Sequence, residues 1–242
     1  YSVTYGAGGS TRDRTMNLVA RLVAENGPPV MPHLTCVASS EADIRSLLDD
    51  YRALGIYRLM ALRGDMPSGA LENAGFTTAQ QLVAYVRELW GNNARIFVAA
   101  YPEVHPRAHT PAADLQAFRD KVAAGATDAV TQYFYNVEAF LRFRDEALAL
   151  GIDVPIVPGI MPISNFNQLS RFSDACGAEI PRWLRKRLEA LQDDLPALCD
   201  YGADVVAGIC ERLIAEGVPA LHFYSMNRAD LIGELCKRLG WC

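Results

Sequence analysis

The segment Leu62-Arg63-Gly64-Asp65 places a cation and an anion on either side of a glycine, directly after an apolar run. Arg63 can pair with a phosphate group, and Gly64 lets a flat or phosphorylated ligand approach the backbone closely. Asp65 can place a negative charge beside a heteroaromatic ring and tune its electronic properties. The segment therefore favours a flat or phosphorylated ligand, with a turn closed by an internal Arg–Asp ion pair as the alternative.

Two further segments carry side chains that suit a planar ligand. In Tyr101-Pro102-Glu103-Val104-His105-Pro106 two prolines stiffen the backbone, so that Tyr101 can stack on a ring and His105 can hydrogen-bond to it. Gln132 lies in an otherwise apolar run, and its amide offers a donor and an acceptor together, which suits the amide-like edge of a pterin. The alternatives are a rigid loop without a ligand and a barrel-interior Gln with satisfied hydrogen bonds.

Composition argues against several other classes of function. The formal net charge of -5 gives no general attraction to nucleic acid or anionic membranes. No apolar run approaches the roughly 18 residues of a membrane span. The scattered cysteines contain no CxxC pair, which favours a reducing compartment such as the cytoplasm. The sequence has no GxGxxG, P-loop or Ser-His-Asp signature, and the spacing of its His and Cys residues predicts no metal site.

Strand-like runs alternate with helical patterns along the whole chain. Strands are expected at residues 2–5, 30–36, 58–62, 95–100, 129–135, 154–160 and 220–224. Helices are expected at residues 12–25, 40–54, 77–90, 111–124, 137–150, 165–216 with interruptions at Pro181 and Pro196, and 228–239.

This alternation implies parallel strand pairing, since each parallel pair needs a crossover connection. The seven units predict an α/β fold, a single-domain (β/α)8 TIM barrel over residues 1–242, with the first strand missing before Tyr1. A doubly wound open sheet is the alternative. In a barrel of this kind the ligand site lies where the strands end. Polar and aromatic residues gather at those positions after nearly every expected strand, so we expect a ligand site there.

The ordered set of these segments resembles the methylenetetrahydrofolate reductase family, in its short bacterial form. The matching stretches are SVTYGAGGSTRDRT (2–15), PHLTC (32–36), LRGD (62–65), AAYPEVHP (99–106), TQYF (131–134), RFRDEALALGIDVPIVPGIMPISNFNQ (142–168) and HFYSMNRA (222–229). The resemblance implies a (β/α)8 barrel with non-covalent FAD, which NADH or NADPH reduces before methylenetetrahydrofolate takes the place of the nicotinamide. It also implies 5-methyltetrahydrofolate as the product, ping-pong hydride transfer, a role in methionine biosynthesis, a cytoplasmic location and a homo-oligomer.

The resemblance also implies roles for individual residues. The positions expected to contact FAD are Tyr5, Ala7, His33, Arg63, Gly64, Asp65, Ala79, Tyr101, His105, Ala108, Asp114 and Lys121. Asp65 also faces the folate and the flavin ring and is the expected catalytic residue. Thr4 is expected to contact the nicotinamide cofactor, Gln132 both substrates, and Gln168 and Arg228 the folate, while Phe172 packs on either substrate.

Three features depart from the family pattern. Ala117 and Asp120 replace polar and basic residues that help to hold the FAD tail. The third is the absence of the Phe-Glu-Phe-Phe-Pro type motif, whose Glu protonates the folate. General acid catalysis of this kind contributes roughly 10^2 to 10^4-fold in rate. We expect this Glu upstream of Tyr1, and we expect residues 1–242 alone neither to close the barrel nor to reduce folate.

Two rival functions fit parts of the sequence. A phosphate-binding barrel lyase or aldolase that forms a Schiff base would need a Lys at a strand end, but Lys121, Lys186 and Lys237 all lie in helical patterns. A flavin- or folate-binding protein without catalysis would fit the missing Glu. The near-complete set of other contacts favours the reductase.

Overall fold

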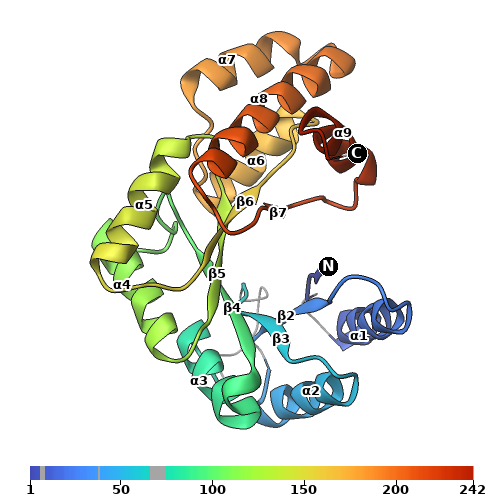
Figure 1. The fold of residues 1–242 in the computed structure, drawn as a ribbon, viewed down its shortest axis with the longest axis vertical. Helices are drawn as coiled ribbons and strands as arrows, with labels where there is room; N and C mark the ends of the chain where they lie inside the picture. The colour runs from blue at the N-terminus through green and yellow to red at the C-terminus, as the bar shows by residue number, and fades with distance from the viewer. Residues whose placement is uncertain (6–8, 38, 66–74, 242) are drawn as a thin grey trace. The chain divides into compact units, whose positions relative to one another are not determined.

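The computed structural model describes residues 1–5, 9–37, 39–65 and 75–241 (Figure 1). The chain divides into two compact units, Tyr1–Ala99 with Phe118–Ala129, and Ala100–Ala117 with Val130–Cys242. Helix α4 (Pro111–Ala123) begins in the second unit and ends in the first, whereas strand β5 (Asp128–Tyr133) begins in the first and ends in the second.

The first unit is built from parallel strands that follow one another in chain order. They are β1 (Ser2–Val3), β2 (Met31–Thr35), β3 (Arg58–Leu62) and β4 (Arg95–Ala100), and the connecting segments hold α1 (Gly9–Ala24), α2 (Glu41–Ala53), α3 (Ala79–Trp90) and the short 3-10 helix η1 (Gly91–Asn93). The register pairs Leu34 with Ala61 and Leu59 with Ile96. These four side chains are almost completely buried, because strands of a parallel sheet are covered on both faces.

The second unit repeats the same β/α pattern. Strand β6 (Ile156–Ile160) pairs in parallel with β7 (His222–Phe223), with Gly159 opposite His222. The helices are α5 (Val137–Ala149), α6 (Phe166–Cys176), α7 (Arg182–Leu191), α8 (Leu195–Ala215) and α9 (Ala229–Arg238). Helices α8 and α9 pack side by side (Figure 1).

The predicted α/β class is confirmed, because the described ranges contain seven strands in chain order, with helices in the connections. These are the β/α units from which a (β/α)8 barrel is built. The prediction of a single domain stays a prediction, as does that of a further strand before Tyr1. Within these ranges no helix is long and apolar enough to span a bilayer.

The interruption predicted at Pro196 lies a few residues earlier. α7 ends at Leu191 and α8 begins at Leu195, so that Pro196 lies in the first turn of α8, after the N-cap Asp194. Proline is tolerated there because the first N–H groups of a helix have no intrahelical partner. Pro181 does lie at a boundary, as the N-cap residue of α7.

The start of α2 is fixed by a capping box. Ser40 accepts the backbone N–H of Asp43 at 3.1 Å, and Asp43 accepts the backbone N–H of Ser40 at 3.3 Å. Glu or Gln is the usual partner in such a box. The shorter Asp side chain still completes the box.

A buried carboxylate joins β4 to β5 within the first unit. Asp128 has a side chain that is only 3% exposed, and Arg95 binds it through two bonds of 2.9 and 2.6 Å. The hydroxyl of Thr127 donates a third hydrogen bond to Asp128, at 2.8 Å. Breaking a buried pair from one side leaves an uncompensated charge, which is far costlier than losing an exposed pair.

Replacing Arg95 by Met should therefore destabilise the protein by about 2–3 kcal/mol, somewhat below the range for fully buried pairs because half of the Arg95 side chain is exposed. Chemical denaturation would measure the change. Arg21→Met, which removes a highly exposed pair with Glu25, is the control and should cost less than about 1 kcal/mol. Equal losses in the two variants would contradict the role assigned to Asp128.

Candidate functional site

Arg63 follows β3, and its guanidinium has one buried N–H group that makes no hydrogen bond to the described residues. Its Nε donates to the carbonyl oxygen of Thr77 at 3.1 Å, while Nη1 is buried and has no hydrogen-bond partner among the described residues. A buried donor without a partner is costly in a native structure and usually marks a place for a ligand, ion or water. The next residue, Gly64, has φ +83°, and a Cβ there would lie 2.8 Å from Cβ of Thr35. A glycine is thus required directly beside this guanidinium.

Other predicted flavin contacts of the first unit lie on β2 and next to β1. Nε2 of His33 is 2.5 Å from the hydroxyl oxygen of Ser2. Tyr5 is half-buried, and this burial raises the pKa of its phenol. Thr4 is exposed, and its carbonyl oxygen accepts a hydrogen bond from Thr15 at 3.3 Å.

Two further predicted residues of this unit lie on helices α3 and α4. Ala79 is the first residue of α3, directly after the N-cap Thr78. Nζ of Lys121 donates to the carbonyl oxygen of Ala99 at 2.5 Å and lies over the ring of Phe118. Asp65 is exposed after Gly64. Ala7 lies outside the described residues.

In the second unit, the loop after β4 brings four predicted flavin contacts together. The rings of Tyr101 and His105 meet edge to face, with centroids 4.5 Å apart. The backbone N–H of His105 donates to Oδ2 of Asp114 at 2.8 Å, and its carbonyl oxygen accepts the N–H of Ala108 at 2.8 Å. Nδ1 of His105 accepts the N–H of Arg107 at 3.0 Å, which leaves Nε2 as the protonated nitrogen of a neutral ring. The loop is therefore held from within, as the two prolines predict.

Gln132 lies near the end of β5, and its side chain is half-buried. Its Oε1 accepts the backbone N–H of Tyr133 at 3.0 Å. The neighbouring Thr131 is fully buried and accepts two bonds, one at Oγ1 from the N–H of Gly159 and one at its carbonyl oxygen from the hydroxyl of Tyr224, both at 2.9 Å. These bonds tie the ends of β5 and β6 to the residue that follows β7.

The three predicted folate contacts of the second unit line one pocket. Gln168 and Phe172, one turn apart on α6, and Arg228, the N-cap residue of α9, border a cavity of about 230 Å³ together with Tyr224 and Ser225. Phe172 exposes 36% of its surface, so a ligand in the pocket can contact its ring. Arg228 is aligned by two bonds to Asp230, at 2.9 and 2.7 Å. The pocket combines an amide, an aromatic face and a cation.

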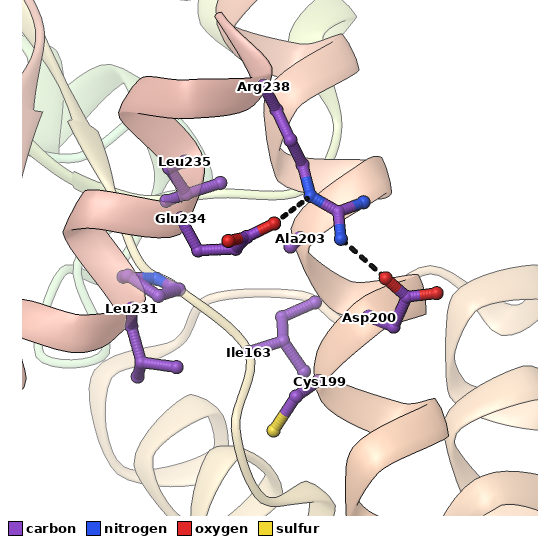
Figure 2. Close-up of a pocket in the computed structure, with 9 residues that line it drawn as sticks. Ile163, Cys199, Asp200, Ala203, Leu231, Glu234, Leu235 and Arg238 are labelled. Carbon is purple, nitrogen blue, oxygen red and sulfur yellow. Dashed lines mark hydrogen bonds and ion pairs between the residues drawn. The ribbon is translucent and has the colours of Figure 1, made fainter. Parts of the chain in front are cut away.

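A second pocket, of about 200 Å³, shares Leu231 with the first (Figure 2). Arg238 borders it and points from α9 toward α8, where Nη2 is 2.5 Å from the carboxylate of Asp200 and Nη1 pairs with Asp204. Glu234 binds its Nε at 3.1 Å. Apart from Arg238, Asp200 and Glu234, the lining is mainly apolar. We therefore assign this pocket to the interface at which α9 packs against α8.

The structure gathers predicted residues into local groups in the second unit, whereas those of the first unit have separate partners. The groups of the second unit are the Tyr101–Asp114 loop and the Gln168, Phe172 and Arg228 pocket. The prediction that both units contribute to one ligand site stays a prediction. The sequence predicts only a strand that ends at residue 224, and it predicts Glu103 only as part of a stiff loop. No sequence signal revealed that the Glu103 side chain reaches residue 179. In the described ranges no cluster of three or more His, Cys, Asp or Glu residues has the arrangement of a metal site.

Comparison with known proteins agrees with the resemblance seen in the sequence. The family model of methylenetetrahydrofolate reductase matches residues 1–240. The chain is 41% identical to 5,10-methylenetetrahydrofolate reductase of Escherichia coli K12 over 99% of its own length and 79% of that protein. It is 38% identical to methylenetetrahydrofolate reductase (NADH) 1 of Arabidopsis thaliana, over 93% of this chain and 40% of the plant protein.

Among solved structures, the fold is similar to that of an uncharacterized protein from Clostridium thermocellum that binds two copies of 5-methyl-5,6,7,8-tetrahydrofolic acid. The TM-score is 0.64 at 16% identity, over 99% of this chain and 93% of that one, so this likeness bears on the fold alone. The family match and the identity to the bacterial relative decide the classification: the chain belongs to the methylenetetrahydrofolate reductase family.

Proposed function

We propose that this protein reduces 5,10-methylenetetrahydrofolate to 5-methyltetrahydrofolate, using NADH or NADPH and bound FAD in a ping-pong reaction. The observation that carries the proposal is the pocket bordered by Gln168, Phe172 and Arg228, three residues whose folate roles follow from the family pattern. Their chemistry suits a folate, because the amide can pair with a pterin edge, the ring can stack, and the cation can bind a carboxylate. The cytoplasmic location and homo-oligomeric state are part of the same proposal.

The residues present fit FAD as the cofactor. Bound FAD supplies two-electron chemistry, accepting hydride from the nicotinamide and passing it to the folate. Nη1 of Arg63, which has no partner among the described residues, offers a buried donor, and Gly64 next to it has φ +83°. Tyr101 offers a ring for stacking, and His105, Asp114 and Lys121 complete the set that would hold the cofactor. Asp65 is proposed to face the flavin ring and the folate.

The proposal is tested by purifying the protein at its natural full length and recording its visible absorption. A flavin spectrum that bleaches anaerobically with NADH or NADPH and returns on addition of methylenetetrahydrofolate supports the reductase. A protein that takes up no FAD contradicts it. A protein that binds flavin and folate without exchanging electrons between them would match the rival function of a non-catalytic binder. Comparing the bleaching rates with NADH and NADPH would settle the preferred nicotinamide.

Arg228→Ala should affect only the folate half of the reaction. Removal of the cation should raise the KM for the folate by about 10- to 100-fold, since a charge-assisted bond to a carboxylate is lost. The rate of flavin reduction by the nicotinamide should stay unchanged. Asp230→Asn is the matched control, because it keeps the guanidinium and removes only the partner that aligns it. A folate KM that is unaltered in Arg228→Ala would exclude this residue from the pocket's function.

A further inference from the structure

Glu103 reaches out of its loop to a distant part of the second unit. Its Oε2 accepts the backbone N–H of Glu179 at 2.8 Å, across 76 positions of sequence. Ala178 and Ile180, on either side of Glu179, are both buried. The carboxylate therefore attaches the loop after β4 to a segment whose neighbours are fixed in the core.

A second contact joins the same two segments. Gly177 ends α6 in the left-handed region, with φ +76°. A Cβ at this position would lie 3.0 Å from Cγ of Pro106 and 3.3 Å from the carbonyl oxygen of Val104. The loop thus packs closely against the C-terminal end of α6, the helix that carries Gln168 and Phe172.

The loop adopts a conformation that needs such support. Val104, a β-branched residue, has φ +73°, a region that such residues rarely occupy without constraint from their surroundings. On one side of Val104 the Glu103 carboxylate binds the residue 179 N–H, and on the other side the His105 N–H binds Asp114. These two bonds hold the strained residue from both directions and so set where the ring of His105 lies.

The second oxygen of Glu103, Oε1, is buried and has no hydrogen-bond partner among the described residues. The pKa of this carboxyl is raised to about 7, chiefly because the group is buried. The hydrogen bond from the Glu179 N–H and the charge of Arg142 on α5 lower the pKa, and the charge of Glu179 raises it. Tyr133 on β5 also faces this group, since the charge of Glu103 contributes to the raised pKa of that phenol. The packed loop therefore favours the neutral carboxyl.

We propose that Glu103 is a positioning residue whose side chain clamps the Tyr101–Pro106 loop to the C-terminal end of α6, and thereby sets the flavin contacts of the loop relative to the folate contacts of the helix. This inference rests on the proposed function. It assigns Glu103 no contact with either ligand. The effect of the clamp is transmitted through Tyr101 and His105 on one side and through Gln168 and Phe172 on the other.

The clamp has a defined pH dependence. Because the pKa of Glu103 lies near 7 when the loop is packed and near 4.5 when it is open, the packed arrangement binds the proton more tightly. Its stabilisation is complete below about pH 4.5 and is lost as the pH rises through about 7. Glu103→Gln cannot ionise but keeps an oxygen that can accept the residue 179 N–H. In this variant the packed loop should therefore keep its stabilisation as the pH rises through about 7.

The experiment compares Glu103→Ala, Glu103→Gln and the wild type at full length, with FAD and methylenetetrahydrofolate as probes. Loss of the acceptor in Glu103→Ala should raise both the dissociation constant of FAD and the KM of the folate by about tenfold. Glu103→Gln should stay within about twofold of the wild type near pH 5 and should bind FAD more tightly than the wild type near pH 8. The control is Asp174→Ala, which removes an exposed carboxylate from α6. It should change neither the dissociation constant of FAD nor the KM of the folate.

The outcomes separate this inference from the proposed function. A wild type that binds neither FAD nor folate overturns the proposed function. A wild type that binds both, together with a folded Glu103→Ala that binds both equally well, overturns only the role of Glu103. A ratio of FAD affinities between wild type and Glu103→Gln that is constant from about pH 5 to pH 8 also overturns it. Since this last comparison uses an isosteric variant, it decides the matter even where Glu103→Ala fails to fold.

Discussion

Gly159→Ala is expected to prevent the second unit from folding normally. A Cβ at this position would lie 2.2 Å from the carbonyl oxygen of Thr131 and 2.6 Å from Cε2 of Tyr224. The first of these atoms is backbone in β5, so the clash cannot be relieved by a side-chain rotation. We expect a loss of at least about 3 kcal/mol, at the upper end for overpacking, or a failure to obtain soluble protein. Denaturant unfolding would measure it.

Gly208→Ala is the matched control. Gly208 is an exposed residue within α8, and a Cβ there would meet no atom within 4 Å. Because glycine is a poor helix former, this change should stabilise the protein by about 0.5–1 kcal/mol. Opposite signs for the two Gly→Ala changes are the expected result. A mild effect at Gly159 would show that β5 and β6 can separate at little cost.

Arg63→Met is expected to separate cofactor binding from stability. The variant removes a guanidinium whose buried Nη1 has no partner among the described residues, and puts a flexible apolar side chain in its place. FAD affinity should fall by about 100-fold, because a charge-assisted contact and its orientation are lost together. The protein without cofactor should unfold at an equal or higher temperature, since a buried donor without a partner among the described residues no longer opposes folding.

Flavin titration and thermal unfolding of the same preparations would test this pair of effects. Arg52→Met serves as the control, because it removes an exposed arginine that lies 3.9 Å from Asp49. It should change neither the FAD affinity nor the unfolding temperature appreciably. If Arg63→Met destabilised the protein without cofactor as much as it weakened FAD binding, Arg63 would be a structural residue.

The elements that the sequence predicted well are those whose signals are local. The strand at residues 58–62 and the strand at residues 95–100 have the predicted bounds, because apolar runs of this length between a glycine or polar segment and a loop leave little choice. Short strands were overestimated: β7 covers only His222–Phe223 of the predicted 220–224. Its bounds depend on pairing with β6, which is a tertiary property.

The candidate site residues also divide into those that the sequence could predict and those that depend on tertiary contacts. The sequence alone predicts Gln168, Phe172 and Arg228 as site residues, from their types and their match to a family pattern. All three line one pocket of the structure. The hydrogen bond from the residue 179 N–H to Glu103 could not be predicted. No pattern in the sequence of the loop indicates that this carboxylate is buried beside the end of a helix. The same holds for Thr131, whose two hydrogen bonds come from residues 28 and 93 positions away.

Helix α9 carries Arg228 before its first turn and Arg238 in its last, about 15 Å apart along the axis at 1.5 Å per residue. The far end is bound to α8 through two acidic side chains, Asp200 and Asp204. A ligand held by Arg228 therefore binds only one state of this helix, the docked one, and must shift the local opening equilibrium toward it. By reciprocity, any change that releases α9 from α8 weakens ligand binding at Arg228 by the same free energy.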